Sequence, residues 1–332
     1  MSVLSRAHFY DEKAAFEHVE SILWADGRSC PHCGNLGKHY KLEGVRSKAS
    51  KKNPEGIERH GLYKCAECRK QFTVRIGTIF EESHIPLHKW LQAIHLMCSS
   101  KKGISSNQLH RTLEITLKSA WFLSHRIREA MRSGDLDPMG GAGKVIEADE
   151  TYFGKRENEY VSPQRRGRPY ISKKGRGPAG KRPIVSLVER GGNVRSFHVN
   201  HANKKTVSAI VWNNVSREST FYTDESALYG DVRRTFVASD MVRHSAEEYV
   251  RGDVHTNTVE GFYSIFKRGM KGVYQHCKEK HLHRYLAEYD FRYNNRVKLG
   301  VDDSARAVTA LLGAKGKRLT YEGPDKLQTI MA

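Results

Sequence analysis

No stretch of about 18 apolar residues, the length that a membrane-spanning helix requires, occurs in the 332-residue sequence, which excludes a spanning helix. The first residues lack the apolar core of a secretory signal and already carry charge at Asp11 and Glu12, which favours a cytoplasmic protein. Acidic residues are scarce, because 37 Asp and Glu stand against 56 Lys and Arg, a formal charge of +19. That excess predicts a polyanionic partner, and nucleic acid is the first candidate.

Apolar side chains are nonetheless sufficient for folded domains. Hydrophobic residues make up 38% of the chain, with 12 Phe, 15 Tyr and 4 Trp, so wholesale disorder is excluded. The length predicts two or three compact units rather than one.

Six cysteines are present, and four of them form two C-x-x-C pairs, Cys30–Cys33 and Cys65–Cys68. Four thiolates at this spacing can bind one tetrahedral zinc ion, so the pairs predict a zinc ribbon within residues 1–80. Disulfides are the alternative, but they do not persist in a reducing cytosol. The 31 residues between the pairs carry several lysines with proline and glycine, and they predict an inserted basic hairpin or loop.

Residues 84–132 have the pattern of three amphipathic helices. Pro86 opens the first, Ser105 begins the second with a Ser-x-x-Gln capping box, and the third covers residues 118–132. A short helix, a brief turn and a helix with a basic outer face predict a helix-turn-helix that enters the major groove of DNA; a plain three-helix bundle is the alternative. The basic face of the third helix consists of Lys118, His125, Arg128 and Arg132.

A glycine-rich linker at residues 133–143 precedes a different pattern, which covers residues 144–296. Three strands in succession, followed by alternating helices and strands, predict a mixed α/β sheet with helices on its faces. Residues 297–332 form a C-terminal tail with a short helix. The expected strands are Val145–Tyr152, Pro183–Glu189, Val194–Val199, Thr220–Thr223 and Thr235–Ala238, and the expected helices are Lys204–Asn213, Thr258–Met270 and His281–Asn294.

The segment at residues 155–182, between the first two strands, carries ten basic residues and two acidic ones. Its glycines and prolines argue against regular structure. We interpret this basic insertion as an arm that binds the phosphate backbone of DNA, and a solvated flexible loop is the alternative. The residues predicted to contact DNA here are Arg165, Arg166, Arg168, Lys173, Lys174 and Arg176.

Three acidic residues occupy positions where a catalytic site can form. Asp149 lies in the first strand, with Glu147 on the same face and Glu150 on the opposite one. Asp224 directly follows a predicted strand, at the end where open α/β sheets place their ligands, and Glu260 lies in a later helix. Clustered carboxylates bind hard divalent cations, and two Mg²⁺ ions would stabilise the entering and leaving oxygens of an in-line phosphoryl displacement.

The helix around Glu260 has one apolar side, which should pack on the sheet, and a narrow polar stripe. In that stripe Glu260 and Lys267 are two turns apart, about 10 Å along the helix axis. An acid and a base at this separation can contact different parts of one extended ligand. His255, just before the helix, is assigned a capping or phosphate-contacting role. The stripe consists of Asn257, Glu260, Ser264 and Lys267.

In combination, these motifs resemble insertion-sequence transposases of the DDE superfamily, in the ISXO-like branch that has an N-terminal zinc ribbon. The resemblance covers roughly residues 20–300. It rests on the segments Tyr63–Phe72, Gly77–Phe80, Ile146–Gly154, His255–Phe262 and Phe291–Arg296.

The resemblance implies a ribonuclease H-like fold for the catalytic domain and two bound Mg²⁺ or Mn²⁺ ions. It also implies that Lys267 contacts the transposon end. Asn257, one turn before Glu260, is the alternative ligand at that position, and Tyr263 stands where many relatives carry Trp, which we interpret as a packing variation. The implied metal ligands are Asp149, Asp224 and Glu260.

The implied activity is DNA transposition. The zinc ribbon and helix-turn-helix would recognise the terminal inverted repeats of an insertion sequence, and metal-dependent hydrolysis would free a 3′ hydroxyl that attacks target DNA directly. Because two double-stranded DNA ends must be held together, we expect a homodimer or a larger assembly, in a bacterial cytoplasm and associated with the nucleoid. Two other classes remain as alternatives: a catalytically silent DNA-binding regulator with the same ribbon and helix-turn-helix, and a ribonuclease H-like nuclease that cleaves without joining.

Overall fold

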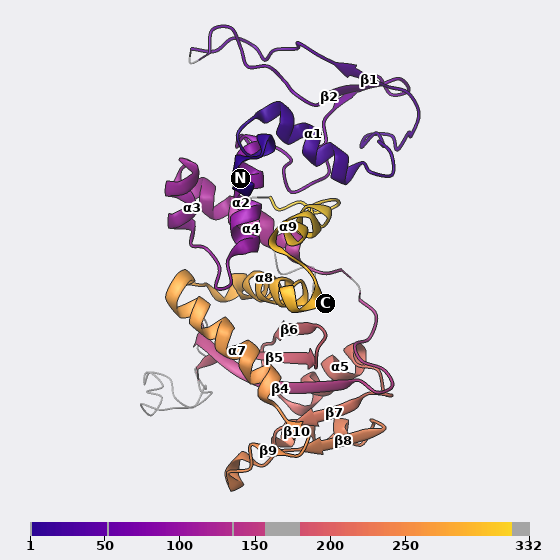
Figure 1. The fold of residues 1–332 in the computed structure, drawn as a ribbon, viewed down its shortest axis with the longest axis vertical. Helices are drawn as coiled ribbons and strands as arrows, with labels where there is room; N and C mark the ends of the chain where they lie inside the picture. The colour runs from indigo at the N-terminus through magenta and orange to yellow at the C-terminus, as the bar shows by residue number, and fades with distance from the viewer. Residues whose placement is uncertain (1, 52, 135, 157–179, 321–332) are drawn as a thin grey trace, which may run out of the picture. The chain divides into compact units, whose positions relative to one another are not determined.

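The computed structural model describes residues 2–51, 53–134, 136–156 and 180–320 (Figure 1). None of the helices within these ranges is long and apolar enough to cross a membrane. The chain divides into two units: unit 1 consists of Met1–Ser100, Ile104–Arg132 and Asp303–Ala332, and unit 2 of Lys101–Gly103 and Ser133–Asp302.

Two short 3-10 helices, Val3–Ser5 and Ala7–Phe9, precede helix α1 (Glu12–Leu23) in unit 1. Asp11 caps α1 by accepting a hydrogen bond from the backbone N–H of Ala14 at 2.7 Å. A three-stranded antiparallel sheet follows, in the order β1-β2-β3. Arg46 and Glu58 form a bridge beyond the paired ends of β1 and β2, so the segment between the cysteine pairs contains a long hairpin, as predicted. The strands are β1 (His39–Leu42), β2 (Leu62–Cys65) and β3 (Gln71–Phe72).

Within its described residues, unit 1 contains four further α-helices: α2 (Leu87–Ser99), α3 (Ser106–Leu113), α4 (Leu117–Met131) and α9 (Asp303–Leu312). The Ser105 hydroxyl accepts from the backbone N–H of Gln108 at 3.1 Å, which confirms the predicted start of α3. Glu114 ends α3 in the left-handed conformation, and Thr116 caps α4, so three residues connect these helices. Helix α9 packs against α2, so a segment from the far end of the sequence completes this bundle.

Unit 2 contains a five-stranded mixed sheet in the order β6-β5-β4-β7-β8. Its first three strands are antiparallel neighbours, while β7 lies parallel to β4, and β8 parallel to β7. This is the mixed α/β sheet that the pattern predicted. The strands are β4 (Val145–Lys155), β5 (Lys181–Glu189), β6 (Val194–His198), β7 (Thr220–Thr223) and β8 (Ala238–Met241).

The fifth strand was predicted at Thr235–Ala238, and this was wrong. Residues 238–241 pair with β7, whereas the backbone N–H of Thr235 donates to the carbonyl of Val232 in a turn. Phe236 is buried because its ring stacks on Phe221, with centroids 4.5 Å apart. The apolar pattern at this point therefore marks a core contact, and not a strand.

Helices cover both faces of this sheet (Figure 1). Ile146 and Ala148 of β4 pack in one core with α5 (Lys204–Asn214) and the short α6 (Gly230–Arg233). Residues on the opposite face of β5 pack against α7 (Asn257–Gly269) and α8 (Leu282–Asn294). A small hairpin of β9 (Val250–Arg251) and β10 (Val254–His255) leads directly into α7.

Candidate functional site

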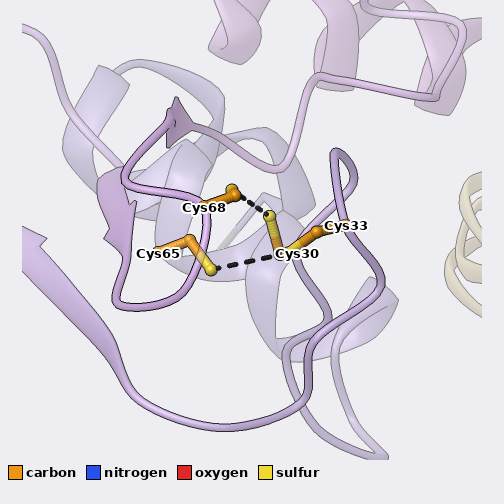
Figure 2. Close-up of side chains that lie close together, drawn as sticks. All are labelled: Cys30, Cys33, Cys65 and Cys68. Atoms are coloured by element: carbon orange, nitrogen blue, oxygen red, sulfur yellow. Dashed lines mark hydrogen bonds between the residues drawn. The ribbon is translucent and has the colours of Figure 1, made fainter.

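The four cysteines of the two C-x-x-C pairs converge in unit 1 (Figure 2). All four Sγ atoms lie within 4.8 Å of one another, and the Cys30–Cys68 and Cys33–Cys65 pairs are each separated by 3.7 Å. Four sulfurs around a tetrahedral zinc, with Zn–S bonds of about 2.3 Å, lie about 3.8 Å apart. The cluster therefore has the donor set and the spacing of a structural zinc site.

The backbone turn at the first C-x-x-C pair positions its cysteines and favours the thiolate form of Cys30. The backbone N–H of Gly34 donates to the carbonyl of Cys30 at 2.8 Å, which closes the first C-x-x-C turn. Burial raises the pKa of the Cys30 thiol, but hydrogen bonds from the backbone N–H groups of His32 and Cys33, together with those from the Cys33 and Cys68 side chains, lower that pKa to about 7. Since the thiolate is the form that binds metal, this turn favours the ligand form of Cys30.

A second cluster lies in unit 2, where one carboxylate oxygen from each of Asp149, Glu150 and Asp224 falls within 4.8 Å of the other two. Register explains the first pair: Glu147 of β4 is aligned with Tyr222 of β7, and Asp149 and Asp224 each lie two residues further along these parallel strands. The predicted convergence of Asp149 and Asp224 is therefore present.

Glu150 joins this cluster although strand alternation assigned it to the opposite face. Strand β7 pairs with β4 at residues 145–147, so β4 runs on past the end of its neighbour. The Glu150 carboxylate can thus reach the space beyond β7, where the Ser226 hydroxyl donates to it at 3.4 Å. Sequence reasoning missed this position, because the residues around Glu150 do not show where β7 stops pairing with β4.

Glu260 stands apart from this close set, which among the described residues contains Glu150 instead. Glu260 is exposed on α7, receives a hydrogen bond from the Thr256 hydroxyl at 3.3 Å, and lies 3.8 Å from Nε2 of His244. Its charge nevertheless acts at the site, because it contributes to the raised pKa of Asp149. Asn257 is also exposed, one turn before it.

The carboxylates oppose one another's ionisation. Burial is the main cause that raises the pKa of Asp149 well above its usual value, followed by the charges of Asp224 and Glu150. Burial and then Asp224 likewise raise the pKa of Glu150, and hydrogen bonds from the side chains of Tyr229 and Ser226 oppose that shift. Oxygen ligands of Mg²⁺ lie about 2.1 Å from the ion, so a shared cation would need small side-chain rotations only, and it would relieve this repulsion.

Two residues of α7 extend the site. Lys267 is half-buried, and burial lowers its pKa while the charge of Asp149 opposes that shift. The Tyr263 hydroxyl donates to the backbone carbonyl of Asp149 at 2.6 Å, and its ring lies 5.9 Å from Nζ of Lys267. Tyr263 is therefore more than a packing variation, since it ties α7 to β4 at Asp149.

The predicted basic face of the third helix is only partly exposed. Lys118 and Arg132 are exposed, but His125 and Arg128 are each 1% exposed. Arg128 donates to the Ser124 hydroxyl at 3.0 Å, and the His125 ring lies 4.3 Å from that of Trp121. The expectation of a basic outer face was wrong at His125 and Arg128, because this side of α4 is buried.

The predicted DNA contacts of the basic insertion lie outside the described residues. They are Arg165, Arg166, Arg168, Lys173, Lys174 and Arg176.

Comparison with known proteins supplies the class. Residues 10–71 match a transposase zinc-ribbon domain, and residues 141–294 match an ISXO2-like transposase domain. A protein of Halobacterium salinarum, described as an uncharacterized protein in transposable element ISH50, is 28% identical over 299 residues, which cover 86% of this chain and 91% of that protein.

Solved structures of the Mos1 transposase are weakly similar. The Mos1 strand transfer complex is 14% identical with a TM-score of 0.22, over 62% of this chain and 76% of that one. The Mos1 paired-end complex with Mg is 15% identical with a TM-score of 0.24, over 69% and 79%. Scores this low do not establish a shared fold.

The cysteine cluster lies within the segment that matches a transposase zinc-ribbon domain, and the carboxylate cluster lies within the segment that matches a transposase domain. More narrowly, the chain carries an ISXO2-like transposase domain, of the DDE type, behind an N-terminal transposase zinc ribbon. The similar protein from Halobacterium salinarum is archaeal, so this comparison does not support the bacterial origin that we expected.

Proposed function

We propose that this transposase binds the terminal inverted repeats of an insertion sequence, hydrolyses a phosphodiester there, and joins the freed 3′ end to target DNA. The observation that carries the proposal is the convergence of Asp149, Glu150 and Asp224 within 4.8 Å, inside the matched transposase domain. The sheet order, with β4 between an antiparallel and a parallel neighbour, is consistent with the ribonuclease H-like fold that the resemblance implies.

Asp149, Asp224 and Glu260 are the proposed ligands of two Mg²⁺ or Mn²⁺ ions, and Glu150 is close enough to share a cation with the first two. Asn257 remains the alternative to Glu260. Bound divalent ions would supply positive charge to both oxygens of an in-line phosphoryl displacement. Lys267 would place its ammonium group on a phosphate of the transposon end, in the same stripe of α7 as Glu260.

DNA recognition is assigned to the zinc ribbon together with α3 and α4, acting as a helix-turn-helix. The three-residue connection between these helices and the exposed Lys118 and Arg132 support that assignment. The basic insertion would add contacts to phosphates, since the chain carries a net charge of +19. Holding two DNA ends together calls for a homodimer or a larger assembly.

The decisive test compares Asp149→Asn and Asp224→Asn with wild type, using labelled terminal repeats, a target plasmid and Mg²⁺. Each substitution keeps the side-chain volume but removes a charge, so strand transfer should fall at least about a thousandfold while end binding is retained. Asp231→Asn, which changes an exposed aspartate of α6, is the matched control and should keep full activity.

The same assay separates the alternatives. Joined products from wild type identify a transposase, cleaved but unjoined ends identify a nuclease, and binding without either product identifies a silent regulator. Full joining activity in both aspartate variants would show that these carboxylates are not catalytic.

A further inference from the structure

Glu147 is a completely buried carboxylate, with 0% of its side chain exposed, two residues before Asp149 on the same face of β4. A buried charge is costly unless its oxygens are fully hydrogen-bonded. Both oxygens of Glu147 accept hydrogen bonds, and these bonds connect the carboxylate to two other elements of unit 2.

The first element it holds is the start of α7. Oε2 of Glu147 accepts from the backbone N–H groups of Thr258 at 2.8 Å and of Val259 at 3.1 Å, and Oε1 accepts from the Thr258 hydroxyl at 2.8 Å. These amides belong to the first turn of α7, where N–H groups have no partner within the helix and the helix dipole favours a negative charge. A strand residue thus caps the helix that carries Glu260 and Lys267.

Arg190, directly after β5, is the second element. Its Nε donates to Oε1 of Glu147 at 2.6 Å, which compensates the buried charge. Its other nitrogens donate to the backbone carbonyls of Asp253 at 2.7 Å and His255 at 3.0 Å. One ion pair therefore connects β4, β5 and the hairpin that leads into α7.

Contacts between α7 and β4 flank Glu260 along the helix, one before it and one after it. Glu260 follows Val259 directly, and Tyr263, one turn later, donates to the carbonyl of Asp149. We propose that Glu147 is a positioning residue: it fixes the first turn of α7 against β4, and so sets the positions of Glu260 and Lys267 relative to Asp149. This inference rests on the proposed function, because it gives Glu147 its role through the metal-binding carboxylates.

Direct contact with a cation is a different role, and the geometry does not favour it for Glu147. Its oxygens are occupied by the N–H and O–H donors of α7 and by Arg190, and among the described residues it does not belong to the carboxylate set within 4.8 Å. An effect of Glu147 on metal binding would therefore be transmitted through α7.

The test is Glu147→Gln in the full-length, zinc-loaded protein, with Mn²⁺ alone as the probe. Glutamine keeps the volume but loses the charge and one acceptor, so Mn²⁺ affinity, measured by electron paramagnetic resonance, should fall about 10- to 100-fold. Hydrogen exchange of the Thr258 and Val259 amides should rise about tenfold or more, which reports on the start of α7 without any reaction.

Two variants keep the test decisive. Thr258→Val removes one hydroxyl donor and leaves Glu147 in place, so it should fold and weaken Mn²⁺ binding about two- to tenfold. Asp290→Asn is the matched control, because this carboxylate of α8 accepts from the backbone N–H of Ser196 at 2.8 Å and from the Ser196 hydroxyl at 2.7 Å, where α8 packs against β6. It should leave Mn²⁺ affinity and exchange at α7 unchanged.

The outcomes separate the two proposals. If Asp149→Asn abolishes Mn²⁺ binding while Glu147→Gln and Thr258→Val bind as wild type does, the positioning role is overturned and the proposed function stands. If Asp149→Asn itself retains Mn²⁺ binding and strand transfer, the metal-binding role of Asp149 fails, and the positioning role of Glu147 fails with it. The proposed function itself fails if the wild type gives no joined products. If Glu147→Gln does not fold, Thr258→Val alone decides, and unchanged affinity in that variant overturns the inference.

Discussion

The cysteine cluster of unit 1 and the carboxylate cluster of unit 2 assemble from the chain in different ways. Each C-x-x-C pair brings two ligands on one turn, so a single long-range contact between two turns completes the set. Asp149 and Asp224, by contrast, become neighbours because β7 pairs in parallel with β4, although β5, β6 and α5 separate these two strands in the sequence. Spacing along the chain therefore predicts the first site, and the sheet decides the second.

The difference extends to stability. The four cysteines lie within 4.8 Å of one another beside a small core that includes Tyr63 and Phe72, so we expect zinc binding to be coupled to the folding of this region. The carboxylates are held by strands whose residues pack in two cores, one on each face of the sheet. Losing a ligand should thus unfold the first region, but should impair only the chemistry of the second.

The largest effect that would test this contrast is loss of zinc. Chelation, or Cys30→Ser, should unfold the ribbon and lower sequence-specific end binding at least about 100-fold, while the thermal unfolding of unit 2 stays unchanged. End binding can be followed by fluorescence anisotropy, and unfolding by calorimetry. Cys277→Ser, in unit 2 and outside the cluster, is the control. Unchanged affinity for the ends would remove the ribbon from recognition.

A smaller effect is expected for the test of which carboxylates bind the metal ion. Glu150→Gln should keep the fold, because both side chains have similar volume, and should weaken Mn²⁺ binding about tenfold. The Mn²⁺ affinity and the strand-transfer activity of Glu260→Gln, measured in the same way, show whether the exposed Glu260 is also a metal ligand. Wild-type affinity in Glu150→Gln would mean that the close approach of Glu150 has no role in metal binding.

The smallest effect concerns the basic insertion. Replacing Lys173, Lys174 and Arg176 together by alanine should weaken binding to all DNA sequences alike and reduce the slope of log K against log salt by about 2 to 3. Lys204→Ala with Lys205→Ala, at exposed positions of α5, serves as the control. A slope equal to that of wild type would identify the insertion as a solvated loop.

Helical periodicity predicted correctly which side of α7 is buried, but it did not predict which side of α4 is buried. Its apolar side, including Val259 and Phe262, is buried on the sheet, and its polar stripe is exposed as far as Ser264. The same reasoning failed at His125 and Arg128, because a helical wheel divides a helix into sides but does not say which of them will be covered. Basic residues on a polar side can still be buried when they find partners.

Several elements have local causes and can be predicted from residues that are close together in the chain: the two cysteine turns, the capped start of α3 and the amphipathic α7. Hydrogen bonds and side-chain spacing within a few residues decide these features. The position of Glu150 in the space beyond β7, and the capping of α7 by Glu147 from a strand more than a hundred residues earlier, depend instead on how the sheet is assembled. Such contacts depend on where one strand ends relative to its neighbour, and no local pattern carries that information.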